Sequence, residues 1–325
     1  MIITSLHGSL TVLNFFLMAF NWQTFKTRTL TAAVFVIVML AGLLINRWTF
    51  FILFSVIHFG CWWEYLGLVE KIYKNPFHKY FKIGLMLIGY GMMAWINLLF
   101  YYTEFAFREL IFTIIPFIGY GLLIFGFSRT QWNNIRASRV ALLGLFYISL
   151  SLGLMLTLWG IGVDASCMGI GGIVGVTKSS IFYFIIFPVI IISSLWVNDT
   201  MAYIVGSLIG KTPLTKISPK KTWEGTIGGI ILSILVVGYI LFPILQANFA
   251  LDIALPFENY HWFVIAGIAS IAGTFGDLLE SKLKRMAGVK DSGHIMPGHG
   301  GFLDRFDSLL VATPFVWLYV YLFMR

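Results

Sequence analysis

Long apolar stretches separated by shorter polar ones dominate this sequence. A bilayer core of about 30 Å needs roughly 17–25 apolar residues in a helix. Ten stretches approach that length, at about 8–24, 29–45, 48–68, 83–102, 111–127, 140–162, 181–198, 227–245, 262–279 and 308–324. The pattern therefore predicts an all-α, polytopic integral membrane protein with about ten transmembrane helices.

The longest polar stretches are 199–226 and 280–307, and no soluble domain is interposed between the apolar ones. We therefore divide the chain into a multi-spanning region, 1–180, and a C-terminal region with two polar loops, 181–325. Residues 181–210 are nearly apolar around Asp199 and would span about 45 Å as one helix. That helix must either protrude from the bilayer or break near Asp199, whose carboxylate needs a wet cavity or a cation.

Composition excludes several other classes of protein. Of 325 residues, 59% are hydrophobic and 11% are charged, whereas soluble domains carry about 25% charged residues. Cys61 and Cys167 are far apart, so neither a zinc site nor a disulfide framework is indicated. The net charge of +8 is expected to face anionic headgroups or anionic substrates, and we expect no nucleic-acid partner.

The basic residues are distributed unevenly between the two predicted faces. Loops that follow the odd-numbered stretches hold 18 of the 22 Lys and Arg residues, and the opposite face holds 4. Cytoplasmic loops of membrane proteins carry such an excess. The asymmetry predicts that both long polar stretches face the cytoplasm and that both termini are non-cytoplasmic.

Acidic residues gather near the C-terminus, where they could hold a metal. Asp277, Ser281 and Lys284 share one face if the helix continues, and Asp304 and Asp307 share another. Carboxylates close together favour a hard cation such as Mg²⁺. The alternative is that Asp304, Arg305 and Asp307 only cap the last helix and pair with basic residues of the loop. Glycines between them could let backbone N–H groups approach phosphate, at positions Gly288, Gly293, Gly298, Gly300 and Gly301.

The second polar stretch combines Asn198-Asp199-Thr200 with a basic segment that ends in Ser218-Pro219-Lys220-Lys221-Thr222-Trp223-Glu224-Gly225. The two lysines and the neighbouring hydroxyls could hold phosphate. The alternative is a basic cytoplasmic loop whose Thr and Glu begin the next helix.

Two other features are weaker signals. The run from Gly206 to Thr212 looks like a P-loop but is one residue short and lacks the context of a buried strand. Glu64 follows Trp62 and Trp63 near a predicted cytoplasmic helix end. It could line a cavity, but an interfacial anchor is the interpretation we favour.

The stretch from Ser281 to Asp307 resembles the signature of the phosphatidate cytidylyltransferase family, also called CDP-diacylglycerol synthase. The resemblance covers residues 180–325 closely and includes the 198–200 and 218–225 segments. Met201 departs from the glycine of many members. The matching C-terminal residues are Ser281, Lys284-Arg285, Lys290-Asp291, Pro297-Gly298-His299-Gly300-Gly301 and Asp304-Arg305-Phe306-Asp307.

The resemblance implies that CTP and phosphatidate react to CDP-diacylglycerol and pyrophosphate, with Mg²⁺ and a second cation such as K⁺. It implies Asp277 and Asp304 as metal ligands, with Asp307 nearby, and an integral protein of a bacterial-type inner membrane. A homodimer is compatible with the family. The matching catalytic residues are Asp277, Asp304, Asp307, Lys284 and Arg285. The matching substrate-binding residues are Asn198, Asp199, Ser218, Lys220, Lys221, Thr222, Glu224, Ser281, Lys290, Asp291, Pro297, Gly298, His299, Gly300, Gly301 and Arg305.

The chemistry suits these residues, because an anionic lipid phosphate must approach the anionic α-phosphate of CTP. The barrier is largely charge repulsion and positioning, which cations address. Two alternatives stay open. One is another CTP-dependent lipid enzyme, either a polyprenol kinase or a cytidylyltransferase for a different lipid phosphate. The other is a transporter, which would more naturally place polar residues at the midplane in both halves.

Overall fold

The computed structural model describes residues 22–100, 106–129, 135–167, 178–249, 258–295 and 300–324. These residues are helical apart from short connections, and they contain no named β-strand. The helices are α2 (Trp22–Leu44), α3 (Arg47–Tyr73), α4 (Lys79–Phe100), α5 (Ala106–Arg129), α6 (Ile135–Gly144), α7 (Ser151–Cys167), α8 (Lys178–Ile209), α9 (Trp223–Val236), α10 (Phe242–Phe249), α11 (Tyr260–Met286) and α12 (Leu303–Phe323). Two π-helical turns, η1 (Leu145–Leu150) and η2 (Val237–Leu241), join α6 to α7 and α9 to α10.

Six of the described helical rods are long and apolar enough to cross a membrane, and two shorter apolar helices accompany them. This confirms the helical membrane class. Each predicted stretch from 29–45 onward coincides with a helix. The first stretch, 8–24, lies almost wholly outside the described residues, so the total of about ten spans stays a prediction.

The helix α8 resolves the question raised by its length. It runs unbroken for 32 residues through Asp199 and contains Pro188, which corresponds to about 48 Å. The helix therefore does not break near Asp199, which lies within its last three turns.

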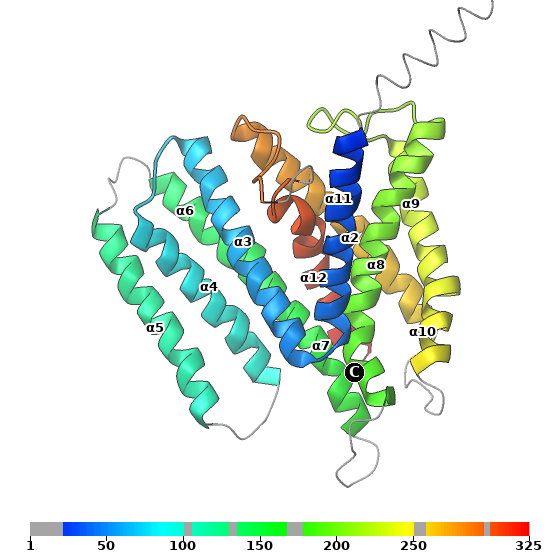
Figure 1. Ribbon diagram of the computed structural model, residues 1–325, viewed down its shortest axis with the longest axis horizontal. Helices are drawn as coiled ribbons and strands as arrows, with labels where there is room; N and C mark the ends of the chain where they lie inside the picture. The colour runs from blue at the N-terminus through cyan, green and yellow to red at the C-terminus, as the bar shows by residue number, and fades with distance from the viewer. Residues whose placement is uncertain are drawn as a thin grey trace, which may run out of the picture.

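The two polar segments of the C-terminal region meet at one end of the molecule. Figure 1 shows the loop between α8 and α9 and the loop between α11 and α12 at the same end, opposite the C-terminus. The loop between α3 and α4 lies at that end as well. The helices α8, α9, α11 and α12 pack on one another beneath these loops, while α4 and α5 pair on the far side of α3.

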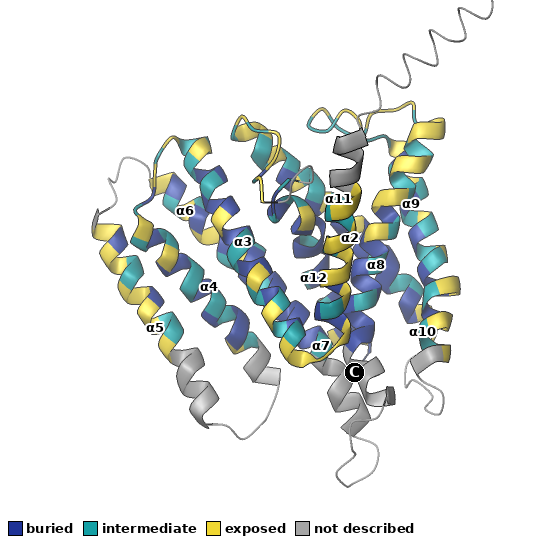
Figure 2. Cartoon of the chain, viewed as in Figure 1, coloured by how far each residue is buried: buried dark blue, intermediate teal, exposed yellow. Residues whose placement is uncertain are grey.

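Burial follows the pattern expected for a bundle in lipid. Trp62 and Trp262 are fully buried between helices, whereas outer helices such as α5 present exposed apolar side chains (Figure 2). Phe117 is 71% exposed and Tyr239 is 69% exposed. Such surfaces are costly in water but suit a hydrocarbon environment, in which helices satisfy their backbone groups internally.

Candidate active site

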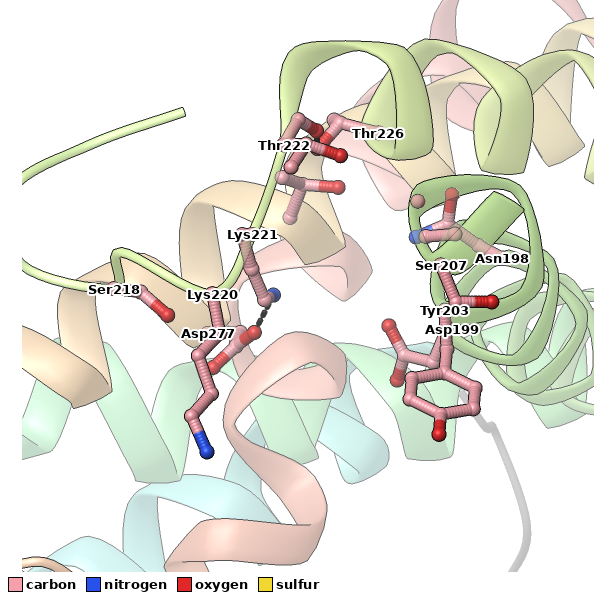
Figure 3. A pocket seen from close by; sticks show the side chains of 13 residues that line it. Asn198, Asp199, Tyr203, Ser207, Ser218, Lys220, Lys221, Thr222, Thr226 and Asp277 are labelled. Carbon is pink, nitrogen blue, oxygen red and sulfur yellow. Dashed lines mark hydrogen bonds and ion pairs between the residues drawn. The ribbon is translucent and has the colours of Figure 1, made fainter. Parts of the chain in front are cut away.

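A cavity of about 510 Å³ opens between α8, α11 and the loop that precedes α9. The polar side chains in Figure 3 come from three separate parts of the chain and surround this space. The cavity brings together seven of the residues predicted from sequence, namely Asn198, Asp199, Ser218, Lys220, Lys221, Thr222 and Asp277. It also contains polar residues that sequence reasoning missed, namely Tyr203, Ser207, Thr226 and Thr274.

An ion pair joins the two motifs across this cavity. The ammonium group of Lys221 contacts the Asp277 carboxylate, as the dashed line in Figure 3 marks. Burial lowers the pKa of Lys221, while the negative charges of Asp199 and Asp307 act in the opposite direction. Lys220 is exposed and lines the same cavity. The two neighbouring lysines thus both line the cavity, one paired with a carboxylate and the other exposed.

Close packing of α9 against α8 places the basic segment beside Asn198 and Asp199. A Cβ added at Gly229 would lie 2.8 Å from the carbonyl oxygen of Asn198, a distance that real side chains do not tolerate. Thr222 caps α9 by accepting a hydrogen bond from the Gly225 N–H at 3.2 Å. Small residues thus bring the two backbones together, as is common between membrane helices.

Glu224 does not line the cavity, although the resemblance placed it among the substrate-binding residues. Its carboxylate accepts hydrogen bonds from the backbone N–H groups of Lys211 and Thr212, both at 3.2 Å. In this structure it fastens the start of the loop to the first turn of α9. The P-loop-like run forms no separate loop, because Gly206 and Ser207 lie inside α8, where they line the cavity and Gly206 packs against Thr222.

Three carboxylates meet where α11 approaches α12. One ligand oxygen from each of Asp277, Glu280 and Asp307 lies within 4.8 Å of the others. Glu280 is fully buried and Asp307 is 7% exposed. The close approach depends on Gly276, since a Cβ there would lie 2.5 Å from the backbone oxygen of Asp307.

Asp304 lies beside this cluster but has other partners. Its carboxylate accepts hydrogen bonds from the N–H groups of Ser292 at 2.9 Å and Gly301 at 2.8 Å. Lys284 Nζ lies 2.6 Å from Asp304 Oδ1 and 2.5 Å from Glu280 Oε2. The structure therefore groups Asp277 with Glu280 and Asp307, and brings Asp304 against both Glu280 and Lys284.

The donor set fits a hard divalent cation. Four carboxylates and the two ammonium groups of Lys221 and Lys284 would leave two negative charges uncompensated if all were ionised, which equals the charge of one Mg²⁺. Glu280 is fully buried, and its carboxyl group lies against that of Asp304. Two buried carboxyl groups in contact cost free energy unless a cation or proton lies between them. Oxygen-only ligands are those that Mg²⁺ prefers.

Other predicted residues lie around the cavity or outside it. Ser281 Oγ donates to Asp277 Oδ1 at 3.4 Å. Arg305 lines a second, smaller cavity of about 110 Å³ together with Asp199, Asp304 and Asp307. Pro297, Gly298 and His299 lie outside the described residues, and Gly300 has a positive φ of 80°. Among the predicted site residues, three are exposed and line neither cavity, namely Arg285, Lys290 and Asp291.

The interpretation of Glu64 as an interfacial anchor is wrong. Its side chain is 5% exposed, and its carboxylate accepts hydrogen bonds from the N–H groups of Phe302 and Leu303, both at 2.9 Å. The adjacent tryptophans suggested an interface, but Trp62 is buried in the core. The sequence signal that pointed to a buried Glu64 was the presence of this acidic residue inside the apolar stretch 48–68.

Comparisons with known proteins find one matching family model and several similar enzymes. A model described as the cytidylyltransferase family matches residues 26–323. The phosphatidate cytidylyltransferase of Staphylococcus saprophyticus is 45% identical over 139 residues, which are 42% of this chain and 49% of that protein. The enzymes of that name from Bacillus subtilis and Haemophilus influenzae are each 44% identical, over 130 and 131 residues, which are 40% of this chain and 45% and 43% of those proteins. Each match therefore spans about half the length of the relative.

Proposed function

The chain belongs to the cytidylyltransferase family, and from this premise we propose that it is a phosphatidate cytidylyltransferase. It would transfer the cytidylyl group of CTP to phosphatidate and release pyrophosphate. The observation that carries the proposal is the ion pair between Lys221 of one motif and Asp277 of the other, inside one cavity. The bacterial relatives reported above carry the same name.

The reaction needs no covalent intermediate on the protein. A phosphate oxygen of the lipid attacks the α-phosphorus of CTP, and the bond from that phosphorus to the oxygen shared with the β-phosphate breaks. The electron pair leaves with pyrophosphate, so no proton transfer is required. Lys220 and Lys221 would bind phosphate oxygens and reduce the repulsion between the two anions. Lys284, held between Glu280 and Asp304, would add positive charge beside the carboxylate cluster.

We propose Asp277, Glu280 and Asp307 as the residues that hold Mg²⁺, with Asp304 positioned beside them. When bound, the ion supplies charge stabilisation for the phosphoryl oxygens and the leaving group. The ligand pair Asp277 and Asp304, as the resemblance implied, stays a prediction, as does a second cation such as K⁺. The position of Glu280 within the carboxylate cluster, buried against Asp304, favours its inclusion.

Three cavities that share lining residues support a lipid as the acceptor of the cytidylyl group. The polar cavity and the smaller one share Asp199. The smaller cavity shares Phe35, Met39 and Phe306 with a third cavity of about 370 Å³, whose lining from α2, α3 and α12 is almost entirely apolar. A molecule with a phosphate head and acyl tails would match this change from polar to apolar lining.

We further propose the topology expected from the basic residues, with about ten spans, both termini non-cytoplasmic and the active site facing the cytoplasm of an inner membrane. Two observations support it. The two motif loops lie at one end of the molecule (Figure 1), and those loops carry most of the C-terminal basic residues. CTP would then reach the site from the cytoplasm. The division at residue 180, a homodimer and the absence of a nucleic-acid partner stay predictions.

The test is to incubate the purified full chain with Mg²⁺, phosphatidate and CTP labelled in the base and at the α-phosphate. The proposal expects a labelled liponucleotide and equimolar pyrophosphate. A polyprenol kinase would instead release CDP, and a cytidylyltransferase for another lipid would be inactive until its own acceptor is supplied. A transporter would form neither product. Asp277→Asn should abolish turnover, while Glu258→Gln, an exposed change far from the site, should leave it intact.

A further inference from the structure

Glu64 reaches the active-site loop from a distant part of the sequence. It lies in α3, yet its carboxylate accepts three hydrogen bonds from residues 228–239 positions later. Phe302 N–H donates to Oε1, while Leu303 N–H and the Ser292 hydroxyl donate to Oε2, the last at 2.6 Å. The helix α3 packs against both α11 and α12.

The loop backbone is shaped to admit this carboxylate. A Cβ added at Gly293 or at Gly301 would collide with the Glu64 carboxylate oxygens. Gly293 and Gly301 both belong to the loop between α11 and α12, and the Glu64 carboxylate lies between these two parts of the loop. Any other residue at either position would force Glu64 or the loop to move.

The contacts of Glu64 lead directly to the catalytic carboxylates. The two N–H groups it accepts from belong to the start of α12, where unpaired N–H groups favour a negative charge. The Ser292 hydroxyl also lies 3.0 Å from Asp304 Oδ2. Asp307 follows one turn later on α12. The position of the Glu64 carboxylate therefore fixes where α12 begins, and with it where Asp304 and Asp307 lie relative to α11.

We propose that Glu64 is a positioning residue for the cytidylyl transfer. From α3, it holds the start of α12 in place, so that the carboxylates of α12 meet those of α11 around the cation. This inference rests on the proposed function for its catalytic consequence. The hydrogen bonds themselves do not depend on that function.

The chain supplies a matched control on the same helix. Glu70 also uses its carboxylate to hold a loop, accepting hydrogen bonds from Phe77 N–H at 2.7 Å and from Lys82 Nζ at 2.6 Å. That loop joins α3 to α4 and contributes nothing to the active-site cavity. Glu64→Gln and Glu70→Gln are thus similar changes with different neighbours. In Glu64→Gln the new amide NH₂ would face a backbone donor, so at least one hydrogen bond is lost.

The experiment measures hydrogen exchange and Mg²⁺ dependence in the full-length protein. In Glu64→Gln we expect amide exchange at Phe302 and Leu303 to accelerate by roughly 10- to 100-fold, as befits lost charge-assisted hydrogen bonds. We expect the Mg²⁺ concentration for half-maximal liponucleotide formation to rise at least about fivefold and kcat to fall about 10- to 100-fold. Glu70→Gln should change none of these.

Exchange at the start of α12 that is unchanged in Glu64→Gln would overturn the proposal. Faster exchange with an unaltered Mg²⁺ requirement and kcat would also overturn it, since Glu64 would then be a structural anchor only. A wild-type protein that forms no liponucleotide would refute the proposed function instead, and the exchange data would still decide whether Glu64 holds α12. If Glu64→Gln does not fold, Ser292→Ala removes only the hydroxyl between Glu64 and Asp304, and we expect smaller shifts of the same sign.

Discussion

Gly276→Ala tests whether the spacing of α11 and α12 sets the geometry of the carboxylate cluster. The added Cβ would lie 2.5 Å from the backbone oxygen of Asp307 and 2.9 Å from Cα of Ser308. Ordinary van der Waals contact begins at 3.4 Å, so the helices must separate by about 0.9 Å, the difference between 3.4 and 2.5 Å. These neighbours are backbone atoms, which cannot rotate away as a side chain can.

The consequence should appear in catalysis more than in folding. Overpacking of this kind costs about 1–3 kcal/mol of folding free energy. We expect the helix bundle to remain folded despite that loss. A displacement near 1 Å at reacting groups costs on the order of 10²-fold in rate. We expect the Gly276→Ala protein to lose about 10²-fold in kcat and to need more Mg²⁺, because Asp277 and Asp307 move apart together with their helices.

The matched control is Gly267→Ala on the same helix. There the nearest atom to a new Cβ is Ile234 Cδ1 at 3.3 Å, the end of a flexible side chain that can adjust. Steady-state assays of liponucleotide formation across a Mg²⁺ titration compare the two variants, with thermal unfolding in detergent recorded for both. Equal kcat and equal Mg²⁺ dependence in the two proteins would refute the argument that this helix contact sets the site.

Three further predictions concern charge and topology. Burial lowers the pKa of Lys221, so its positive charge is lost as pH rises through that lowered value. Lys221→Arg should therefore move the alkaline limb of the kcat/KM profile to higher pH. If the alkaline limb does not move, it reports the titration of another group. Lys284→Met leaves the buried Glu280 carboxylate without its cation, which should cost about 3–5 kcal/mol and lower the melting temperature in a thermal unfolding scan; an unchanged melting temperature would contradict this. In a background without the native cysteines, Lys216→Cys should resist an impermeant maleimide in intact cells while Glu258→Cys reacts, and the reverse pattern would overturn the proposed orientation.

The helices were predictable because a bilayer imposes a length on each of them. Every stretch from 29–45 onward coincides with a described helix. The extension of α8 past Asp199 could not be decided from sequence, since a protruding helix and a broken one have the same apolar pattern. The two motifs were also recognisable as parts of one site, and the cavity joins Lys221 to Asp277 as that interpretation requires.

The residues that sequence reasoning misjudged are those whose role depends on helices far apart in the chain. Glu64 beside two tryptophans has the local pattern of an interfacial belt, and only the contact of α3 with the 292–303 segment reveals its partners. Glu280 is one of the two acidic residues on α11, and the other, Asp277, belongs to the recognised motif. Its burial comes from neighbouring helices whose identity the periodicity of one helix does not specify. The role of Gly276 likewise depends on a neighbouring helix, because its close contact is with the backbone of α12.

The ion pairs of the site also explain why acidic and basic residues are concentrated together. A site with carboxylates alone would bind Mg²⁺ but repel a triphosphate, and one with lysines alone would bind phosphate without a cation for the leaving group. Lys221 and Lys284 each contact carboxylates of the cluster in this structure, so positive and negative groups lie side by side in it. Asp277 would hold the cation in the proposed site, and Lys221 beside it would contact a phosphate oxygen of the substrate. The two opposite charges would thus serve the two parts of one metal–phosphate complex.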